Sequence, residues 1–419
     1  MTLAMKIRVN KGFKLDLMLA KLSEERTLNS DGSVRISGFG LLDEYKSYFL
    51  TAISAEGQSH AFLRSVVGQA INAEQNLNES TFLKHCNRIA NKTIRDDLRA
   101  YKVLFPVWGS RGLIAGRRKW SDVTINFDVN PDTVFARRAK RARAKQFQKL
   151  VKRKSDATKD FEDLPLAVCS VRAISPRDAF EKAENAISKE LGLYSMHSGR
   201  GKFVINNGPD QPFNTVLLAP HMTVHNTTGA ISTDMYWYNR WPNRLAEKHR
   251  SLEDIVKIKD FAESVRLKLR KLPWREDAEQ SLARYFEAFA QCDLEASFLD
   301  GWRLLEAIGG HPREKSETLI RRAAWFYNER EEYYQIGLHL MHRRNLISHG
   351  RPVRDDNNEG LAFQMKTFVT PLFHAYLTNY FNFKNVEEFW SFCDLPVDKA
   401  VRDRQAHLLN CSARFRDEK

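Results

Sequence analysis

The sequence predicts an α+β protein in which a mixed N-terminal region precedes an all-helical bundle. Two apolar segments, 101–108 and 166–173, have the length and pattern of strands, whereas apolar residues recur at helical spacing almost everywhere after Ser251. With 419 residues, 42% of them hydrophobic, the chain is long enough for two to three domains with their own cores. We therefore expect strands in the first part of the chain and only helices in the last.

Changes of pattern along the chain predict four regions. Residues 1–160 begin with amphipathic helical segments and continue into strands at 101–108 and 120–129 and a basic helix. Residues 161–250 have the pattern of a small α/β region, in which Ser175 and Pro176 are typical of a helix N-terminus. Residues 251–395 form a helical domain, and residues 396–419 a C-terminal tail helix.

Several classes of protein are excluded by the composition. The chain lacks an apolar run of membrane-spanning length, and its first residues lack the pattern of a cleaved signal, so we expect a cytoplasmic protein without a membrane partner. The five cysteines are scattered and form no CxxC pair, which argues against a disulfide framework or a zinc ribbon. The glycines of 109–116 and 199–202 fit neither nucleotide-binding pattern, so we expect no cofactor.

Positive charge is concentrated in one segment of a chain whose net charge is +14. Residues 137–154 hold ten lysines and arginines and no acid, without glycine or proline, which predicts a basic helix. Such a helix is suited to bind the phosphates of a nucleic acid, although a solvated helix or linker is the alternative. The residues that we expect to contact phosphates are Arg137, Arg138, Lys140, Arg141, Arg143, Lys145 and Lys149.

A helix that starts near Asn328 carries a charged residue where apolar residues are expected. The residues of its apolar stripe, within which Arg344 falls, are Tyr333, Ile336, Leu340 and Ile347. Burying a guanidinium is costly unless an acceptor meets it. Arg344 is therefore either paired inside the protein or available to an anion.

His349 follows Arg344 by five residues, which places it about 140° away on a continuous helix. Gly350 and the following Arg-Pro predict that the helix ends here, so its last turn could turn His349 toward the arginine. Asn345 lies four residues before His349 and could hold the ring by a hydrogen bond. His342, seven residues before His349, is an auxiliary candidate or a surface histidine.

The segments FLDGWRLLEAIGG (298–310) and RRNLISHG (343–350) resemble the HEPN superfamily, most nearly its Apea-like or Abi-like branch. The resemblance covers roughly residues 250–395. It implies an all-α HEPN-like bundle that dimerises and, in many members, cuts RNA without a metal. The family pattern of Arg, a following polar residue and a His maps onto Arg344, Asn345 and His349, and Glu306 matches an upstream acidic position.

We therefore expect a metal-independent endoribonuclease that acts in bacterial anti-phage defence as the toxin of an abortive infection system. His349 would move the proton of the 2′-hydroxyl, while Arg344 neutralises charge on the phosphate. A homodimer is expected because the catalytic helix carries further apolar residues: Tyr334, Leu338, Met341 and Leu346. A phage-derived trigger or an antitoxin would control it.

The alternative is a HEPN-like module that binds a nucleic acid or a partner without catalysis, its Arg344 paired with Glu306. An exposed His349 beside an unpaired Arg344 would favour the enzyme. Two weaker patterns lie elsewhere: His221 and His225 could hold a metal only if a third ligand joined them, so we expect none. Tyr236–Trp241 has the composition of a base-stacking surface, although a core strand explains it better.

Overall fold

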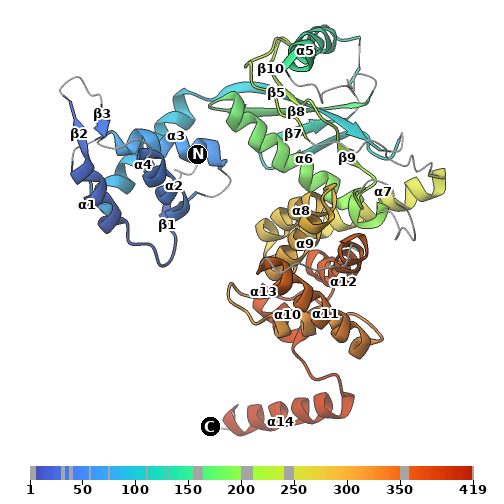
Figure 1. The fold of residues 1–419 in the computed structure, drawn as a ribbon. Coiled ribbons are helices and arrows are strands. Elements are labelled where there is room, and N and C mark those ends of the chain that lie inside the picture. Colours follow the sequence, from blue (N-terminus) through green and yellow to red (C-terminus); the bar gives the residue numbers. More distant parts are fainter. Residues whose placement is uncertain are drawn as a thin grey trace. The chain divides into compact units, whose positions relative to one another are not determined.

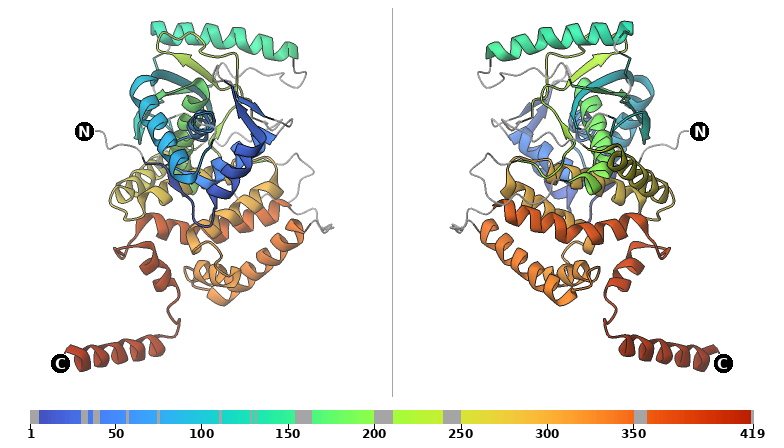
Figure 2. Two further views of the ribbon diagram at one scale, coloured as in Figure 1. Left: turned by 90° about the vertical axis from the view of Figure 1, so that its left-hand side faces the viewer. Right: turned by 90° about the vertical axis from the view of Figure 1, so that its right-hand side faces the viewer.

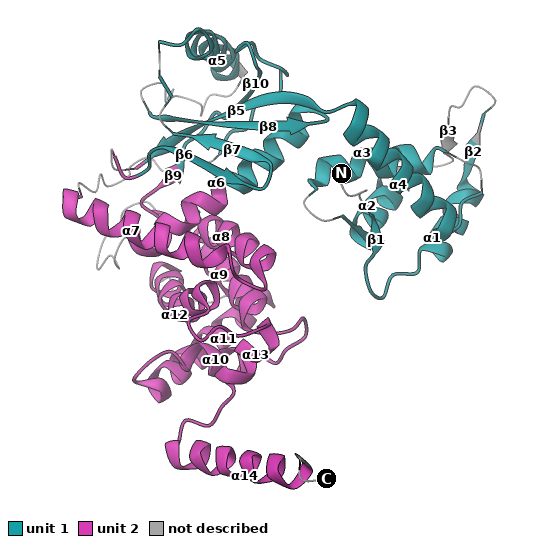
Figure 3. Ribbon diagram, turned by 180° about the vertical axis from the view of Figure 1, so that it is seen from behind, with its two compact units in different colours: residues 1–108, 114–187, 218–239 teal, residues 109–113, 188–217, 240–419 magenta. Residues whose placement is uncertain are grey.

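The structure, a computed structural model, describes residues 6–29, 34–36, 41–55, 58–73, 76–109, 112–127, 129–130, 132–153, 164–199, 211–239, 250–349 and 358–417. These residues form helices throughout the chain and one larger antiparallel sheet (Figure 1), which confirms the predicted α+β class. The chain divides into two compact units (Figure 3): unit 1 comprises Met1–Trp108, Ile114–Ile187 and Leu218–Asn239, and unit 2 comprises Gly109–Leu113, Ser188–Leu217 and Arg240–Lys419.

This division differs from the four ranges expected from the sequence. Strands from 1–160 and 161–250 pair in the same sheet, so these two ranges are not separate bodies. Helix α6 (Pro176–Ser198) crosses from one unit into the other. Long-range strand pairing and the course of a long helix are not visible in local periodicity, which explains the difference.

The first part of unit 1 is helical, as predicted. Its helices are α1 (Leu15–Glu25), α2 (Leu41–Ala52), α3 (His60–Ile71) and α4 (Glu79–Asp96). Two short antiparallel pairs accompany them: β1 (Arg8–Val9) with β4 (Ile53–Ser54), and β2 (Arg26–Leu28) with β3 (Val34–Ile36). Phe49, Phe62 and Phe82 are fully buried in one core between these helices. Asn78 and Thr81 form a capping box that fixes the start of α4.

The sheet of unit 1 has the strand order β10-β5-β8-β7-β6, and β9 (Leu217–Leu218) also pairs with β5. The strands are β5 (Arg99–Trp108), β6 (Arg117–Trp120), β7 (Val123–Asn126), β8 (Leu166–Ala173) and β10 (Thr223–Asn226). The strands predicted at 101–108 and 166–173 are confirmed. The strand predicted over 120–129 is confirmed only at 123–126, because Ser121 has a φ of 50° and turns the chain so that Trp120 ends β6 and pairs with Val123 of β7.

Helices cover both faces of this sheet (Figures 1 and 2). On one face, Ala139 of the basic helix α5 (Val134–Arg153) packs against Leu104 and Val168. On the other face, Phe180 of α6 lies 5.7 Å from Phe105, the neighbour of Leu104 in β5. Adjacent residues of a strand point to opposite faces, so the pleat of β5 separates the two helices. The predicted Ser175 cap is confirmed, since its hydroxyl accepts from the Asp178 backbone at 3.2 Å.

After residue 251, the described part of unit 2 contains only helices, as predicted. They are α7 (Leu252–Leu269), α8 (Arg275–Phe289), α9 (Leu294–Gly309), α10 (Ser316–Ala324), α11 (Arg330–Ser348), α12 (Asn358–Thr378), α13 (Val386–Cys393) and α14 (Lys399–Asp417). The predicted stripe of α9 is confirmed, because its five apolar residues are all buried: Leu294, Phe298, Trp302, Leu305 and Ile308. Within the described ranges, none of the helices has the length and apolar character needed to cross a bilayer.

Gly301 lets α9 lie close to its neighbours. A Cβ at this position would stand 2.8 Å from Met365 of α12 and 3.2 Å from Phe289 of α8. Any larger residue would push these helices apart, and α9 carries both Trp302 and Glu306. The close approach therefore positions one side of the candidate site.

Candidate functional site

Helix α11, which carries Arg344 and ends just before His349, is held against α10 and α12. Gly337 allows this contact, because a Cβ there would lie 2.4 Å from Ile320 of α10 and 2.8 Å from Phe368 of α12. Leu340, one turn further along, is fully buried. The middle of α11 is thus fixed by one glycine and one leucine, and the residues of the site lie on the turns that follow.

The start of α11 is fixed by Tyr327, whose ring stacks on Tyr333 with 3.5 Å between the ring centroids. The Tyr327 hydroxyl also donates a hydrogen bond of 2.6 Å to the backbone oxygen of Thr367. That oxygen lies four residues before Pro371, which has no N–H to donate to it within α12. The Tyr327 hydroxyl therefore replaces the backbone donor that the Thr367 oxygen lacks because of Pro371. This hydrogen bond links the start of α11 to α12.

The apolar stripe predicted for α11 is only partly a core stripe. Of its four residues, Leu340 is buried, whereas Tyr333, Ile336 and Ile347 are half-buried. Arg344 is also half-buried, with 34% of its side chain exposed. Within the described residues, only Gly337 and Leu340 of α11 are buried, so periodicity correctly predicted the helix but overstated its burial.

Glu306 of α9 meets the Arg344 guanidinium. Arg344 Nη2 donates to Glu306 Oε1 at 3.0 Å, and the Trp302 indole N–H donates to the same oxygen at 2.9 Å. Arg344 Nη1 donates to Asn345 Oδ1 at 3.1 Å, and the guanidinium lies over the Trp302 ring at 5.8 Å. Three of the predicted residues, Arg344, Asn345 and Glu306, therefore come together.

His349 stands just beyond the end of α11 and is exposed. Its backbone N–H donates to the Asn345 backbone oxygen at 3.1 Å, and its φ of −94° and ψ of 10° end the helix. We expected the Asn345 side chain to hold the imidazole, but that side chain accepts from Arg344 instead. The His349 ring makes no hydrogen bond with the part of the chain that the structure describes. His342 is likewise exposed, and the Gly-Arg-Pro that follows His349 lies outside the described residues.

This arrangement leaves Arg344 able to bind an anion. A guanidinium has five N–H donors, and the contacts with Glu306 and Asn345 use two of them. The side chain is also exposed enough to meet solvent on its remaining side. The site therefore combines an oriented cation with an exposed imidazole just beyond a helix C-terminus.

Most of the predicted phosphate-binding residues lie on the exposed side of α5. Those with exposed side chains are Arg137, Arg138, Lys140, Arg141, Lys145 and Lys149, and we call this set the basic face. Ala139, Phe147 and Leu150 anchor the other side of α5 in the protein. The exposed cations are therefore presented by a fixed helix.

Arg143 does not belong to the basic face. Only 2% of it is exposed, and its Nε donates to the backbone oxygen of His221 at 3.2 Å. Its place among the expected phosphate contacts is therefore corrected: the side chain points inward and binds the turn before β10. Helical spacing did carry a signal that sequence reasoning missed, because Arg143 lies four residues from both Ala139 and Phe147, on the side of α5 that is anchored in the protein.

The two histidines considered for a metal site are both buried, but their rings are not placed to bind one metal ion together. His225 uses Nε2 with the Thr223 hydroxyl at 2.8 Å and Nδ1 with the Gly229 backbone oxygen at 2.9 Å. His221 precedes the strand with a φ of 66°, so the two rings do not follow strand alternation. Burial lowers the pKa of His221 to about 3 and that of His225 to about 4. Within the described ranges, no three His, Cys, Asp or Glu side chains gather as a metal site.

The aromatic run at 236–238 is half-buried against other parts of unit 1. Tyr236 and Tyr238 contact Phe147 and Leu150 of α5, and Trp237 stacks on Phe180 with 3.9 Å between centroids. This agrees with the core interpretation rather than with a base-stacking surface. Residues 240 and 241 lie outside the described residues.

Comparisons of the chain with protein-family models, with curated proteins and with solved structures find no match. Its function is therefore argued from the site itself.

Proposed function

We propose that this protein is a metal-independent endoribonuclease whose active site lies at the C-terminal end of α11. The observation that carries the proposal is the exposed His349 one turn after an Arg344 that Glu306 and Asn345 orient but leave partly open to solvent. An imidazole that can move protons and a positioned cation are the groups that phosphodiester cleavage needs. The resemblance to HEPN ribonucleases points to the same residues.

The reaction would use the RNA itself as nucleophile. The 2′-oxygen forms a bond to the neighbouring phosphorus while the bond from phosphorus to the 5′-oxygen breaks, which leaves a 2′,3′-cyclic phosphate and a 5′-hydroxyl. His349 takes the proton from the 2′-hydroxyl, and an imidazolium gives a proton to the leaving oxygen. Arg344 neutralises the charge that builds on the phosphate oxygens.

A homodimer would supply both proton-transfer groups. Tyr334, Leu338, Met341 and Leu346 of α11 are half-buried, which leaves apolar surface for a second copy of the helix. The basic face of α5 would hold the RNA by its phosphates without selecting a sequence. A toxin controlled by a phage-derived trigger or an antitoxin is the role that fits such an enzyme.

The proposal is tested by substituting His349→Ala and Arg344→Ala, each of which is expected to abolish RNA cleavage and growth toxicity while circular dichroism stays unchanged. His407→Ala is a matched control, because Arg402 and His407 have the same spacing on another exposed helix. Full activity in either site variant would refute the assignment.

A second candidate function is a scaffold that binds a nucleic acid or a partner without catalysis. The ion pair of 3.0 Å between Arg344 and Glu306 favours it, because a paired arginine is explained without a substrate. Under this alternative, purified protein binds RNA but leaves it intact, and His349→Ala changes nothing. The same assay therefore separates the two functions.

A further inference from the structure

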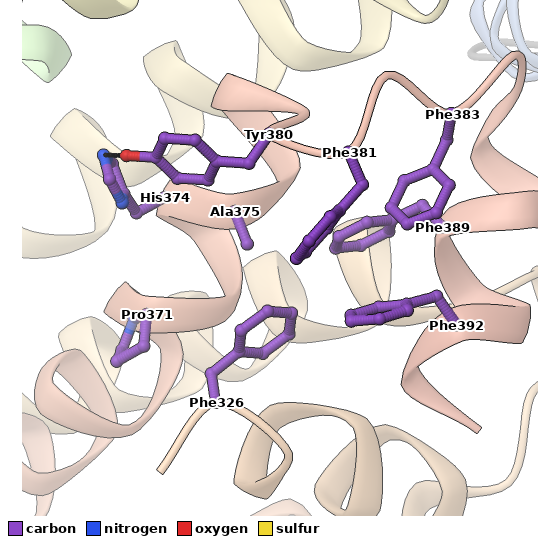
Figure 4. A pocket seen from close by; sticks show the side chains of 9 residues that line it. All are labelled: Phe326, Pro371, His374, Ala375, Tyr380, Phe381, Phe383, Phe389 and Phe392. Atoms are coloured by element: carbon purple, nitrogen blue, oxygen red, sulfur yellow. Dashed lines mark hydrogen bonds between the residues drawn. The ribbon is translucent and has the colours of Figure 1, made fainter. Parts of the chain in front are cut away.

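A pocket in unit 2 is walled almost entirely by aromatic rings. It is a cavity of about 320 Å³ between the α10–α11 connection, the C-terminal half of α12, the turn after α12, and α13 (Figure 4). The aromatic residues that line it are Phe326, Tyr380, Phe381, Phe383, Phe389 and Phe392. Its size lies at the lower end of the roughly 300–1,000 Å³ of pockets that hold ligands.

The lining of this pocket calls for an apolar occupant. His374 and Tyr380 supply its polar atoms, and these already bond to each other, with 3.3 Å between Nε2 and the hydroxyl oxygen. Burial lowers the pKa of His374, so this ring is uncharged at neutral pH. At the rim, Tyr380 is 55% and Phe381 66% exposed, and exposed aromatic residues beside a pocket are typical of a docking surface.

Helix α14 has apolar residues that nothing described covers. Leu408 is 52% exposed, Leu409 71% and Val401 43%. Val401 and Leu408 are seven residues apart and therefore lie on one face of the helix. A single helix of this length is only marginally stable in water, so α14 needs a partner surface.

The charges of α14 and of the pocket region are complementary. Residues 399–417 hold five lysines and arginines and two aspartates. Beside the pocket, Asp394 is already paired with Arg321 and Arg322, and Lys268 lies over the Tyr380 ring, so the acids that remain for α14 are Glu387 and Glu388. Glu387 and Glu388 of α13 are exposed beside Phe389, which lines the pocket. A basic amphipathic helix would approach this acidic surface readily.

The connection between α13 and α14 is bonded to α14 itself. The Arg402 guanidinium donates to the backbone oxygens of Pro396 and Val397, and its backbone N–H donates to the oxygen of Asp398. These bonds join the connection and the first turn of α14 into one unit. Docking of α14 on another chain leaves these bonds in place.

We propose that α14 of one copy docks through Leu408 and Leu409 into the aromatic pocket of a second copy. The exchange would be reciprocal, since each copy offers one helix and one pocket. It is a different surface from that of α11, and the proposal does not depend on RNA cleavage.

Cys411 offers a reporter on the docking helix. It is the exposed cysteine among the five, three others are buried, and the half-buried Cys292 can be replaced by Ser. A polarity-sensitive maleimide dye on Cys411 would report burial of α14 in the full-length protein.

The test mixes two full-length variants. The helix donor carries Phe381→Glu, which blocks its own pocket, and the dye on Cys411; the pocket donor carries Leu408→Glu and Leu409→Glu and no dye. Adding the pocket donor is expected to shift the dye emission to the blue and to raise its anisotropy. Both changes should level off once the pocket donor is in excess. Phe381, Leu408 and Leu409 are all largely exposed, so the substitutions leave the fold intact.

Matched variants define the outcome. Adding Leu408→Glu to the helix donor should weaken docking at least about tenfold, whereas Asn410→Glu, which adds the same charge about 160° from Leu408 and about 100° from Leu409 around α14, should not. An unchanged signal on mixing would overturn the proposal. A second result would also overturn the proposal: a labelled chain with an intact pocket whose emission stays blue-shifted at high dilution. In that case α14 would occupy the pocket of its own chain.

Discussion

Replacing Glu306 by Gln tests how Arg344 is held. The amide keeps the size of the side chain and an acceptor for the Trp302 indole, but it removes the charge that faces Arg344. Because the Arg344 and Glu306 side chains are 34% and 39% exposed, solvent screens their attraction. We expect the free energy of unfolding to fall by only about 0.5–1 kcal/mol.

A double-mutant cycle isolates this interaction. Glu306→Gln, Arg344→Met and the double variant are compared by urea unfolding, and Met retains the apolar stem of the arginine. The coupling energy is expected to be about 0.5–1 kcal/mol and to decrease at high salt, where the pair is screened further. A coupling of about 3 kcal/mol or more would mean a desolvated pair, and no coupling would mean that Glu306 does not hold Arg344.

The same variants separate catalysis from structure. If Arg344 acts on the phosphate, Glu306→Gln leaves the catalytic cation in place and costs no more than about tenfold in cleavage, whereas Arg344→Met abolishes it. If Arg344 only pairs with Glu306, the two substitutions affect RNA binding alike. Equal loss in both variants would therefore contradict the catalytic role of the arginine.

Three further outcomes are expected. Gly337→Ala should destabilise the protein by roughly 1–3 kcal/mol and impair cleavage, because the added Cβ would collide with Ile320. The control Gly68→Ala meets nothing within 4 Å and should stabilise the protein by about 0.5–1 kcal/mol. Thermal unfolding compares the two variants with the wild type. The pKa of His221 is lowered to about 3, so the folded ring stays neutral where the unfolded one takes up a proton, and stability falls as pH drops below about 6.5. His221→Asn, which tolerates the positive φ, should reduce this slope by up to about 1.4 kcal/mol per pH unit, and an unchanged slope would exclude His221 as its source. Changing residues 137, 138, 140 and 141 of the basic face to Gln should lower the slope of log K for RNA binding against log salt by roughly 0.7 per lost contact with single-stranded RNA. If changing Lys84 and Lys92 of α4 to Gln lowers the slope equally, the RNA is bound by the overall positive charge and not by the basic face.

Periodicity predicted the features that depend on local sequence. The five apolar residues of α9 recur at helical steps and are all buried, and the Ser175 cap forms as its residue type indicates. The hairpin between Trp120 and Val123 was missed, because its turn contains neither glycine nor proline and Ser121 adopts a positive φ that no local signal announces.

Contacts between distant residues could not be predicted in the same way. Helical spacing places Arg143 on the buried side of α5, but its acceptor, the His221 backbone oxygen, lies 78 residues later and leaves no local signal. A pair between Glu306 and Arg344 was expected only under the non-catalytic alternative, and the structure forms it. The side-chain partner of Asn345 was predicted incorrectly, since spacing along one helix allows either Arg344 or His349 and cannot decide between them.

Incubation of the purified protein with RNA in the presence of EDTA, wild type beside His349→Ala, tests the central claim most directly. We predict that the wild type cuts RNA under chelation, that its products carry 2′,3′-cyclic phosphate and 5′-hydroxyl ends, and that His349→Ala leaves the RNA intact. Cleavage that strictly requires Mg²⁺, or a His349→Ala variant that cuts at the wild-type rate, would contradict the account.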